Sequence, residues 1–141
     1  MRIVIDTNVL ISGIIFGGKP SKIIELLFGK KISVFASPEM VDEYKRIYGE
    51  LGERYAKRTH NELNEIINSM NILPSHSHIE ACRDPDDNKF IECAIGNRCI
   101  YIVSGDKDLL VLEQYEDIGI LTVSEFLEQY EKKRHKNSTK N

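Results

Sequence analysis

The sequence contains few cysteines and no long apolar run, and these absences exclude several classes of protein. Its three cysteines are an odd number and form no Cys-x-x-Cys motif, which argues against a disulfide framework and favours reduced thiols in packing roles. No apolar run approaches the length that spans a bilayer, and residues 1–6 indicate the start of a strand rather than a signal peptide. We therefore expect a cytoplasmic protein with no membrane association.

The chain also lacks an excess of positive charge. A formal net charge of −3 argues against a protein that holds nucleic acid by bulk electrostatics. It leaves open a local basic surface, or an acidic site where metal ions reverse the local charge. With 141 residues, the chain is long enough for one domain that needs no disulfide or structural metal. We expect this domain to span residues 1–131, followed by a basic, disordered tail over residues 132–141.

The opening stretch is the most informative part of the chain. Ile3, Val4 and Ile5 form a β-branched run typical of a strand buried on both faces, and the run ends at Asp6. Helix-period apolar residues follow at once, so Asp6 lies where a central strand passes into a helix. In open α/β sheets this is where ligands bind. Taken alone, Asp6 is either a site carboxylate or only a helix N-cap.

Predicted strands alternate with predicted helices along the rest of the chain. We expect further strands over residues 32–35, 99–103 and 118–122, and a weaker edge strand over 71–73. We expect helices over residues 7–16, 21–28, from 38 to about 48, 61–70, 84–95 and 124–130. Residues 49–58 suggest a loop or a loosely packed helical excursion. This order predicts an α/β fold in which helices cover both faces of a parallel sheet.

Three further acidic residues are placed by phase or by position. Glu43 shares the inward flank of its helix with Met40 and Ile47. Asp87 is in register with Ala94, so it faces the sheet from the first turn of a core helix. Asp106 comes just after a buried strand, as Asp6 does. The carboxyl ends of parallel strands share one edge, so we expect these carboxylates to converge there.

A convergent group of carboxylates needs compensation, and the sequence shows no matching inward Lys or Arg. The repulsion would be strong in a low-dielectric cleft, and hard divalent cations would relieve it. Oxygen-only ligands favour Mg²⁺ or Mn²⁺ over zinc. The pattern therefore predicts a metal-assisted phosphodiesterase.

Four motifs together resemble the PIN-domain ribonucleases, with VapC-like toxins and small stand-alone PIN proteins as the nearest likeness. The motifs span almost the whole chain: Ile5-Asp6-Thr7-Asn8; Ser37-Pro38 followed by Glu43; Asp84-Pro85-Asp86-Asp87 followed by Phe90-Ile91 and Ala94; and Ser104-Gly105-Asp106-Lys107-Asp108-Leu109. The resemblance implies a three-layer α/β/α fold around a five-stranded parallel sheet ordered 3-2-1-4-5. It also implies a homodimer and, for a toxin of a type II toxin–antitoxin pair, an antitoxin partner.

The resemblance carries the family's acidic site onto the four residues that burial had already selected. These catalytic and metal-binding candidates are Asp6, Glu43, Asp87 and Asp106. Asp84 and Asp108 are alternatives to Asp87 and Asp106 in the metal shell. Asn8 and Ser104 are expected to orient the ligands through hydrogen bonds.

We expect this site to cleave single-stranded RNA with Mg²⁺ or Mn²⁺. Water would attack phosphorus in line and leave 5′-phosphate and 3′-hydroxyl ends. Two enzyme alternatives lack residues that their chemistry needs. A haloacid-dehalogenase phosphatase needs an aspartate where Asn8 stands, and a receiver domain needs an acidic pair after the first strand. A catalytically inactive PIN-like module that binds RNA or protein remains the alternative from another class.

Overall fold

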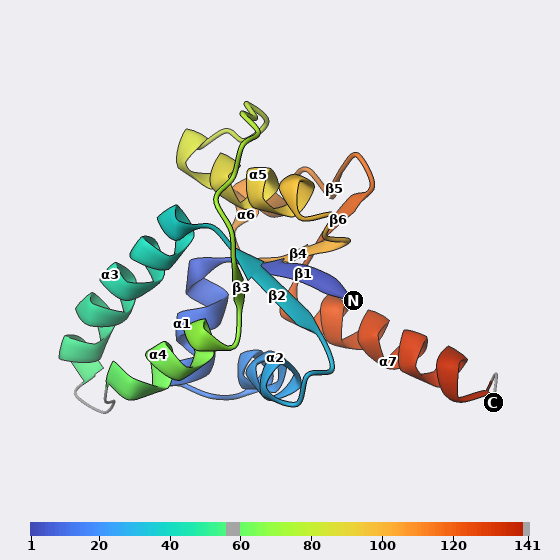
Figure 1. Cartoon of the computed structure of the whole chain (residues 1–141), viewed down its shortest axis with the longest axis horizontal. Coiled ribbons are helices and arrows are strands. Elements are labelled where there is room, and N and C mark those ends of the chain that lie inside the picture. The colour runs from blue at the N-terminus through green and yellow to red at the C-terminus, as the bar shows by residue number, and fades with distance from the viewer. Residues whose placement is uncertain (56–59, 140–141) are drawn as a thin grey trace.

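The computed structural model describes residues 1–55 and 60–139 and shows helices on both faces of a central sheet (Figure 1). The sheet has six strands in the order β3-β2-β1-β4-β6-β5, and every neighbouring pair except β5–β6 is parallel. The strands are β1 (Arg2–Ile5), β2 (Ser33–Ala36), β3 (Asn71–Ile72), β4 (Tyr101–Val103), β5 (Gln114–Tyr115) and β6 (Ile118–Leu121).

The helices form the two outer layers. They are α1 (Thr7–Ile15), α2 (Lys19–Phe28), α3 (Pro38–Tyr55), α4 (His60–Asn68), α5 (Asn88–Gly96), α6 (Lys107–Leu110) and α7 (Val123–Thr139), with a 3₁₀ turn η1 (Pro85–Asp87) before α5. In Figure 1, α5 and α6 lie on one side of the sheet, and α1, α2 and α7 lie on the other. No helix within the described residues has both the length and the apolar character needed to cross a membrane.

The central strands are buried on both faces, as the opening run predicts. Ile3, Val4 and Ile5 are at most 1% exposed, and Ile102 and Val103 of β4 are fully buried. Burying such a side chain stabilises the fold by about 1.5 to 3 kcal/mol. The predicted α/β/α architecture with its parallel sheet is therefore confirmed. It places the ends of β1 and β4 side by side.

The sheet contains one strand that the sequence did not predict. β6 takes the place of the predicted fifth strand, and β5 pairs with it antiparallel at the edge. The connecting turn contains Glu116 at a φ of 52°, in the left-handed region where glycine or asparagine is usual. The turn contains neither glycine nor asparagine, so nothing in the sequence indicated a hairpin here.

Two helices are longer than the sequence suggested. α3 continues through Gly49 and Gly52 to Tyr55, whose ring packs edge-to-face on Phe16 with centroids 5.0 Å apart. This packing extends the helix over most of the segment expected to be a loop or a helical excursion; residues 56–59 lie outside the described residues. Partly buried Leu51, packed against the core, adds an apolar contact on the same stretch.

α7 continues to Thr139, whereas the sequence predicted a disordered tail from residue 132. Charged pairs one helical turn apart support the extension, with Glu128 to Lys132 at 3.5 Å and Glu131 to Arg134 at 3.3 Å. The Nζ of Lys133 also lies 5.0 Å from the centre of the Tyr101 ring. The polar, basic composition of residues 132–141 predicted a disordered tail, because composition does not reveal ion pairs along a helix or a contact with Tyr101. Residues 140 and 141 lie outside the described part of the chain.

Candidate active site

The carboxyl edge of the sheet contains a cleft of about 180 Å³ with five carboxylates in its walls. They are Asp6, Glu43, Asp86, Asp87 and Asp106. They come from the end of β1, the inward flank of α3, the turn η1 and the loop after β4. The structure thus brings together all four carboxylates that the sequence selected and adds Asp86.

Asp6 is both a helix cap and a member of the cleft, so the two interpretations of this residue are compatible. Its side chain is 3% exposed, and its Oδ1 accepts a hydrogen bond of 2.9 Å from the backbone N–H of Val9. Burial raises the pKa of Asp6, and a hydrogen bond from Ser104 partly offsets this effect. One oxygen thus caps α1 and the other faces Ser104.

Ser104 connects the ends of the two central strands. It is fully buried, and its hydroxyl donates to Oδ2 of Asp6. The hydroxyl oxygen of Ser104 also accepts a hydrogen bond of 2.9 Å from the backbone N–H of Asp106. Ser104 thus contacts two of the four candidate carboxylate residues, Asp6 through its side chain and Asp106 through its backbone.

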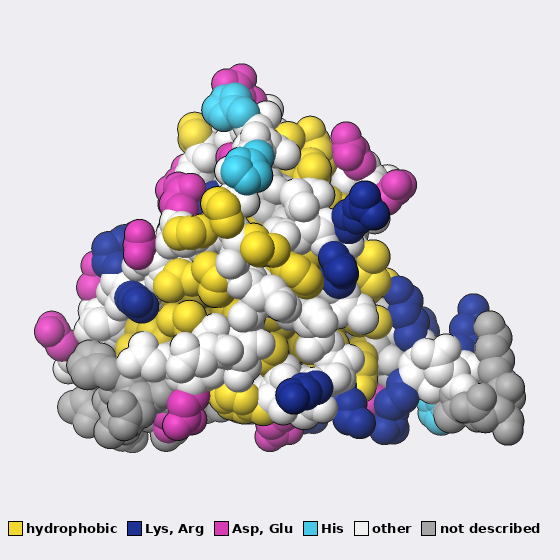
Figure 2. Space-filling model, viewed as in Figure 1, with side chains coloured by type: hydrophobic (Ala, Val, Ile, Leu, Met, Phe, Trp, Pro, Cys, Tyr) yellow, Lys and Arg dark blue, Asp and Glu magenta, His cyan; other side chains and the backbone are white. Residues whose placement is uncertain are grey.

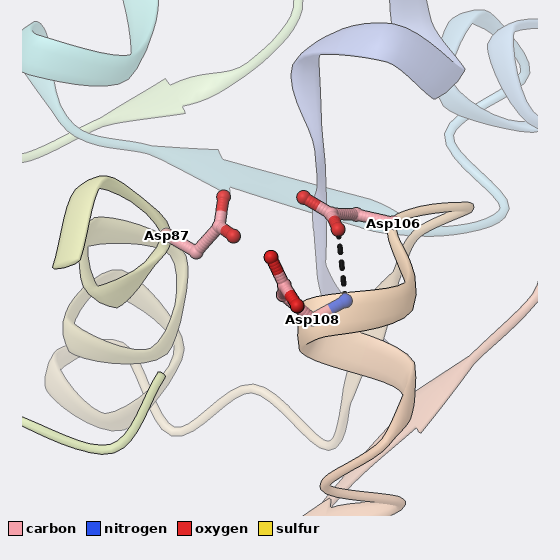
Figure 3. Close-up of side chains that lie close together, drawn as sticks. All are labelled: Asp87, Asp106 and Asp108. Atoms are coloured by element: carbon pink, nitrogen blue, oxygen red, sulfur yellow. Dashed lines mark hydrogen bonds between the residues drawn. The ribbon is translucent and has the colours of Figure 1, made fainter. Parts of the chain in front are cut away.

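Three aspartates form the tightest acidic cluster in the described residues. One oxygen from each of Asp87, Asp106 and Asp108 lies within 4.8 Å of the others. Figure 3 shows the three carboxylates pointing toward one another, Asp87 from the start of α5 and the other two from the start of α6. Oδ1 of Asp106 accepts a hydrogen bond of 2.9 Å from the backbone N–H of Asp108, which fixes the loop. We call these residues the aspartate cluster.

Asp87 is the most perturbed member of this cluster. Burial, reinforced by repulsion from Asp106, raises its pKa from 3.8 to about 7. Its Oδ2 is buried and has no hydrogen-bond partner among the described residues. A buried carboxylate oxygen without a partner is costly. A hard divalent cation would satisfy it, so the donor chemistry of the cluster fits such an ion.

Glu43 and Asp86 are in a different electrostatic state, because a buried lysine compensates them. Nζ of Lys89 lies 3.0 Å from Oε1 of Glu43 and 2.9 Å from Oδ2 of Asp86, and the Lys89 side chain is 5% exposed. Burial alone would lower the pKa of Lys89, but its hydrogen bonds to these carboxylates raise it overall. The Thr7 hydroxyl donates to the other oxygen of Glu43. We call Glu43, Asp86 and Lys89 the lysine-centred group.

The expectation that no inward cation accompanies the acids is therefore wrong. Lys89 lies in the first turn of α5, three residues after Asp86, which is the spacing of a helical ion pair. The spacing of Asp86 and Lys89 could have indicated their ion pair, but the sequence alone did not show that the lysine points inward. The physical reason is its length, because a flexible four-carbon stem can reach back from the helix to the cleft.

The remaining accessory residues lie at the margins of the cleft. Asn8 is exposed on its wall. Asp84 is exposed and caps η1 by accepting a 3.0 Å hydrogen bond from the backbone N–H of Asp86; its charge also helps to raise the pKa of Asp87. Asp108 is about one-third exposed and lies 3.7 Å from Nε of Arg83.

Two residues that the sequence did not single out hold the site in place. Asn88 is buried, and its Oδ1 accepts hydrogen bonds from the backbone N–H groups of Ala81 and Cys82, at 3.1 and 2.9 Å. Tyr44 is fully buried, and its hydroxyl donates at 2.6 Å to the carbonyl of Ile5, next to Asp6. Asn88 fixes the chain before the aspartate cluster, and Tyr44 ties α3 to the end of β1.

The fold and the cleft define an α/β/α protein with an acidic, oxygen-only site at the carboxyl edge of its sheet. A sequence model described as PIN domain matches residues 2–108, so the chain belongs to the PIN-domain family. PIN domains are generally nucleases. The resemblance inferred from the motifs is confirmed at the level of the family.

Two proteins show how far the likeness extends. The uncharacterized protein MJ1680 of Methanocaldococcus jannaschii is 35% identical over 147 aligned residues, which cover 94% of this chain and 93% of that protein. The crystal structure of PAE2754 from Pyrobaculum aerophilum superposes with a TM-score of 0.59 at 14% identity, over 92% of this chain and 89% of that one. At that identity the second likeness supports the fold alone.

Proposed function

We propose that the protein is a ribonuclease that uses Mg²⁺ or Mn²⁺ to cleave phosphodiester bonds in single-stranded RNA. The observation that carries the proposal is the buried, unpartnered Oδ2 of Asp87 in a cluster of three aspartates beside the cleft. A structural role would leave this oxygen paired, because an unsatisfied buried carboxylate destabilises the fold. Membership of a nuclease family provides the chemical context.

The candidate ligands are Asp6, Asp87, Asp106 and Glu43, with Asp108 beside them. Oδ2 of Asp87 accepts no hydrogen bond from the described residues and Oδ1 of Asp106 accepts one, whereas Asp6 already accepts two. Glu43 is compensated by Lys89, so we propose that it positions Lys89 and Thr7 more than it binds the ion. When bound, a divalent cation supplies Lewis-acid stabilisation of the phosphate and lowers the pKa of water in the cleft.

The protein groups have separate roles in this proposal. Ser104 holds Asp6 and the backbone of Asp106 in register across the ends of two strands. Asp87 would offer its Oδ2 to the ion, and the bound ion would hold this carboxylate in its ionised form. Asn8 lies on the exposed wall, where its amide can donate to a substrate phosphate. The expected products carry 5′-phosphate and 3′-hydroxyl ends.

We further propose a cytoplasmic homodimer, and an antitoxin partner if the protein is the toxin of a toxin–antitoxin pair. The free Cys82, Cys93 and Cys99 support a reducing compartment. The resemblance to VapC-like toxins supports the homodimer and the antitoxin partner.

A cleavage assay on a mixed single-stranded RNA pool tests the enzymatic proposal. We expect cleavage with Mn²⁺ or Mg²⁺, none with chelator, and products that a 5′-phosphate-dependent exonuclease degrades. Cyclic phosphate ends would refute the mechanism. RNA binding without cleavage under all metal conditions would favour the inactive binding module instead.

A further inference from the structure

The edge of the sheet opposite the catalytic cleft carries a groove of about 410 Å³. Its walls come from the start of β1, the segments before β2 and β4, and one flank of α7. The residues that line it are Met1, Lys31, Ile100, Tyr130, Lys133, Arg134 and Asn137. We call this the basic groove, because the charged side chains among its described lining residues are all cations: Lys31, Lys133 and Arg134.

The cations of the basic groove are exposed and partly oriented by neighbours. Nζ of Lys133 lies over the Tyr101 ring, 5.0 Å from its centre, and Arg134 is 3.3 Å from Glu131 on the same helix. Glu131 therefore offsets part of the charge of Arg134, and the groove keeps a net positive charge. Figure 2 shows dark blue Lys and Arg side chains gathered on the side of the molecule that carries α7.

The catalytic cleft has the opposite charge. Its five carboxylates are accompanied by Lys89, which is already paired with two of them. Without a bound metal ion this edge repels a polyanion such as RNA, so a basic surface elsewhere would add to the affinity for a long substrate. The whole chain has a formal net charge of −3, which makes the cations at the opposite edge a local feature.

We propose that the basic groove binds the phosphodiester backbone of single-stranded RNA at a second site, at the amino edge of the sheet. The proposal rests on the ribonuclease function proposed above and names the surface that holds the substrate. Cations beside an aromatic side chain, here Tyr130, form the combination that grooves for single-stranded nucleic acid use. A long RNA contacts both edges, whereas a dinucleotide can occupy only one.

The first test measures binding of a fluorescent single-stranded RNA of about 20 nucleotides in chelator. The groove variant is Lys31→Gln/Lys133→Gln/Arg134→Gln. The matched control is Lys22→Gln/Lys45→Gln/Arg54→Gln, which removes the same charges from exposed positions on α2 and α3. We expect the groove variant to bind at least tenfold more weakly and to lose about one unit of salt dependence per cation removed. The control should change affinity less than twofold.

Equal losses in the two variants would overturn the proposal, because bulk charge would then account for the binding. Loss of binding to a glutamate-rich peptide with unchanged RNA binding would also overturn it, since the groove would then fit an acidic protein segment. Circular dichroism and thermal melts of each variant establish that the comparison is between folded proteins.

The second test uses the unaltered protein. RNA that contains 4-thiouridine is photo-cross-linked in chelator, and the modified peptides are mapped. We expect adducts on the peptides that contain Lys31 and Tyr130; adducts confined to the catalytic edge would refute a second site. If the protein cleaves no RNA, the ribonuclease proposal fails, and both binding tests still report on the basic groove.

Discussion

Two groups of carboxylates share one cleft in this protein and differ in how their charge is balanced. In the lysine-centred group, Glu43 and Asp86 lie within 3.0 Å of a buried Lys89. In the aspartate cluster, Asp87 has a raised pKa and an oxygen with no partner among the described residues. The difference shows that inward acids are not equivalent: Lys89 balances the lysine-centred group without a metal ion, whereas no described side chain balances the aspartate cluster in this way.

The largest expected effect is on catalysis. Asp87→Asn and Asp106→Asn each remove a charged oxygen from the aspartate cluster and should reduce RNA cleavage at least about 100-fold at saturating Mn²⁺. Asp42→Asn, an exposed substitution next to Glu43 in the chain, is the matched control. Initial cleavage rates on one defined RNA measure the effect. A rate near that of the unaltered protein in either cluster variant would contradict the assignment.

The next effect is on stability, and it should appear in the lysine-centred group. Lys89→Met removes the buried cation and leaves the partly buried Glu43 with only the exposed Arg46, at 4.0 Å, which should cost about 2 to 3 kcal/mol of the free energy of unfolding. Urea unfolding in chelator measures this, with the exposed Lys45→Met as control. Adding Glu43→Gln to Lys89→Met should recover part of the loss. A purely additive double variant would mean that the pair is not coupled.

A third effect is the pH dependence of metal-free stability. The pKa of Asp87 is about 7 in the folded protein against 3.8 for the ordinary side chain. Between these values the folded state holds a proton that the unfolded state releases, so this group lowers stability as the pH rises from about 4 to 7. Asp87→Asn should flatten this fall and raise stability at pH 8 by on the order of 1 kcal/mol.

Thermal melts in chelator from pH 4 to pH 8 compare the two proteins. Parallel curves over the whole range would show that Asp87 does not titrate there. Mn²⁺ at pH 8 should raise the melting temperature of the unaltered protein and affect Asp87→Asn much less, because only the former keeps the complete cluster.

The smallest expected effect is on metal affinity, and it comes from Asp108, a partly exposed member of the aspartate cluster. Asp108 is about one-third exposed and lies near Arg83, so Asp108→Asn should weaken Mn²⁺ binding by about tenfold or less and keep cleavage at saturating metal. Isothermal titration with Mn²⁺ measures the affinity. A loss as severe as that of Asp87→Asn would place Asp108 among the principal ligands.

The positions of the candidate site residues were easiest to predict where a single rule, either a strand end or helix phase, placed the side chain. Asp6 and Asp106 follow strands whose uninterrupted apolar runs identify them as central, and Asp87 was placed inward by helix phase. Lys89 escaped this reasoning, because phase gives the direction of a Cβ and not the reach of a long side chain. The hairpin of β5 and β6 was not predicted, because Glu116 adopts a left-handed backbone conformation that is rare for glutamate.

The hydrogen bond from Tyr44 to Ile5 has an optical consequence. The chain has six tyrosines and no tryptophan, so tyrosine dominates its near-ultraviolet absorption. Burial holds the pKa of Tyr44 well above 10, and so its phenol cannot ionise while α3 remains docked on β1. In an alkaline pH jump, exposed tyrosines ionise immediately, whereas Tyr44 and the buried Tyr48 of the same helix ionise only when α3 opens. The slow phase of tyrosinate absorbance therefore reports the opening rate beside Asp6, without an added label.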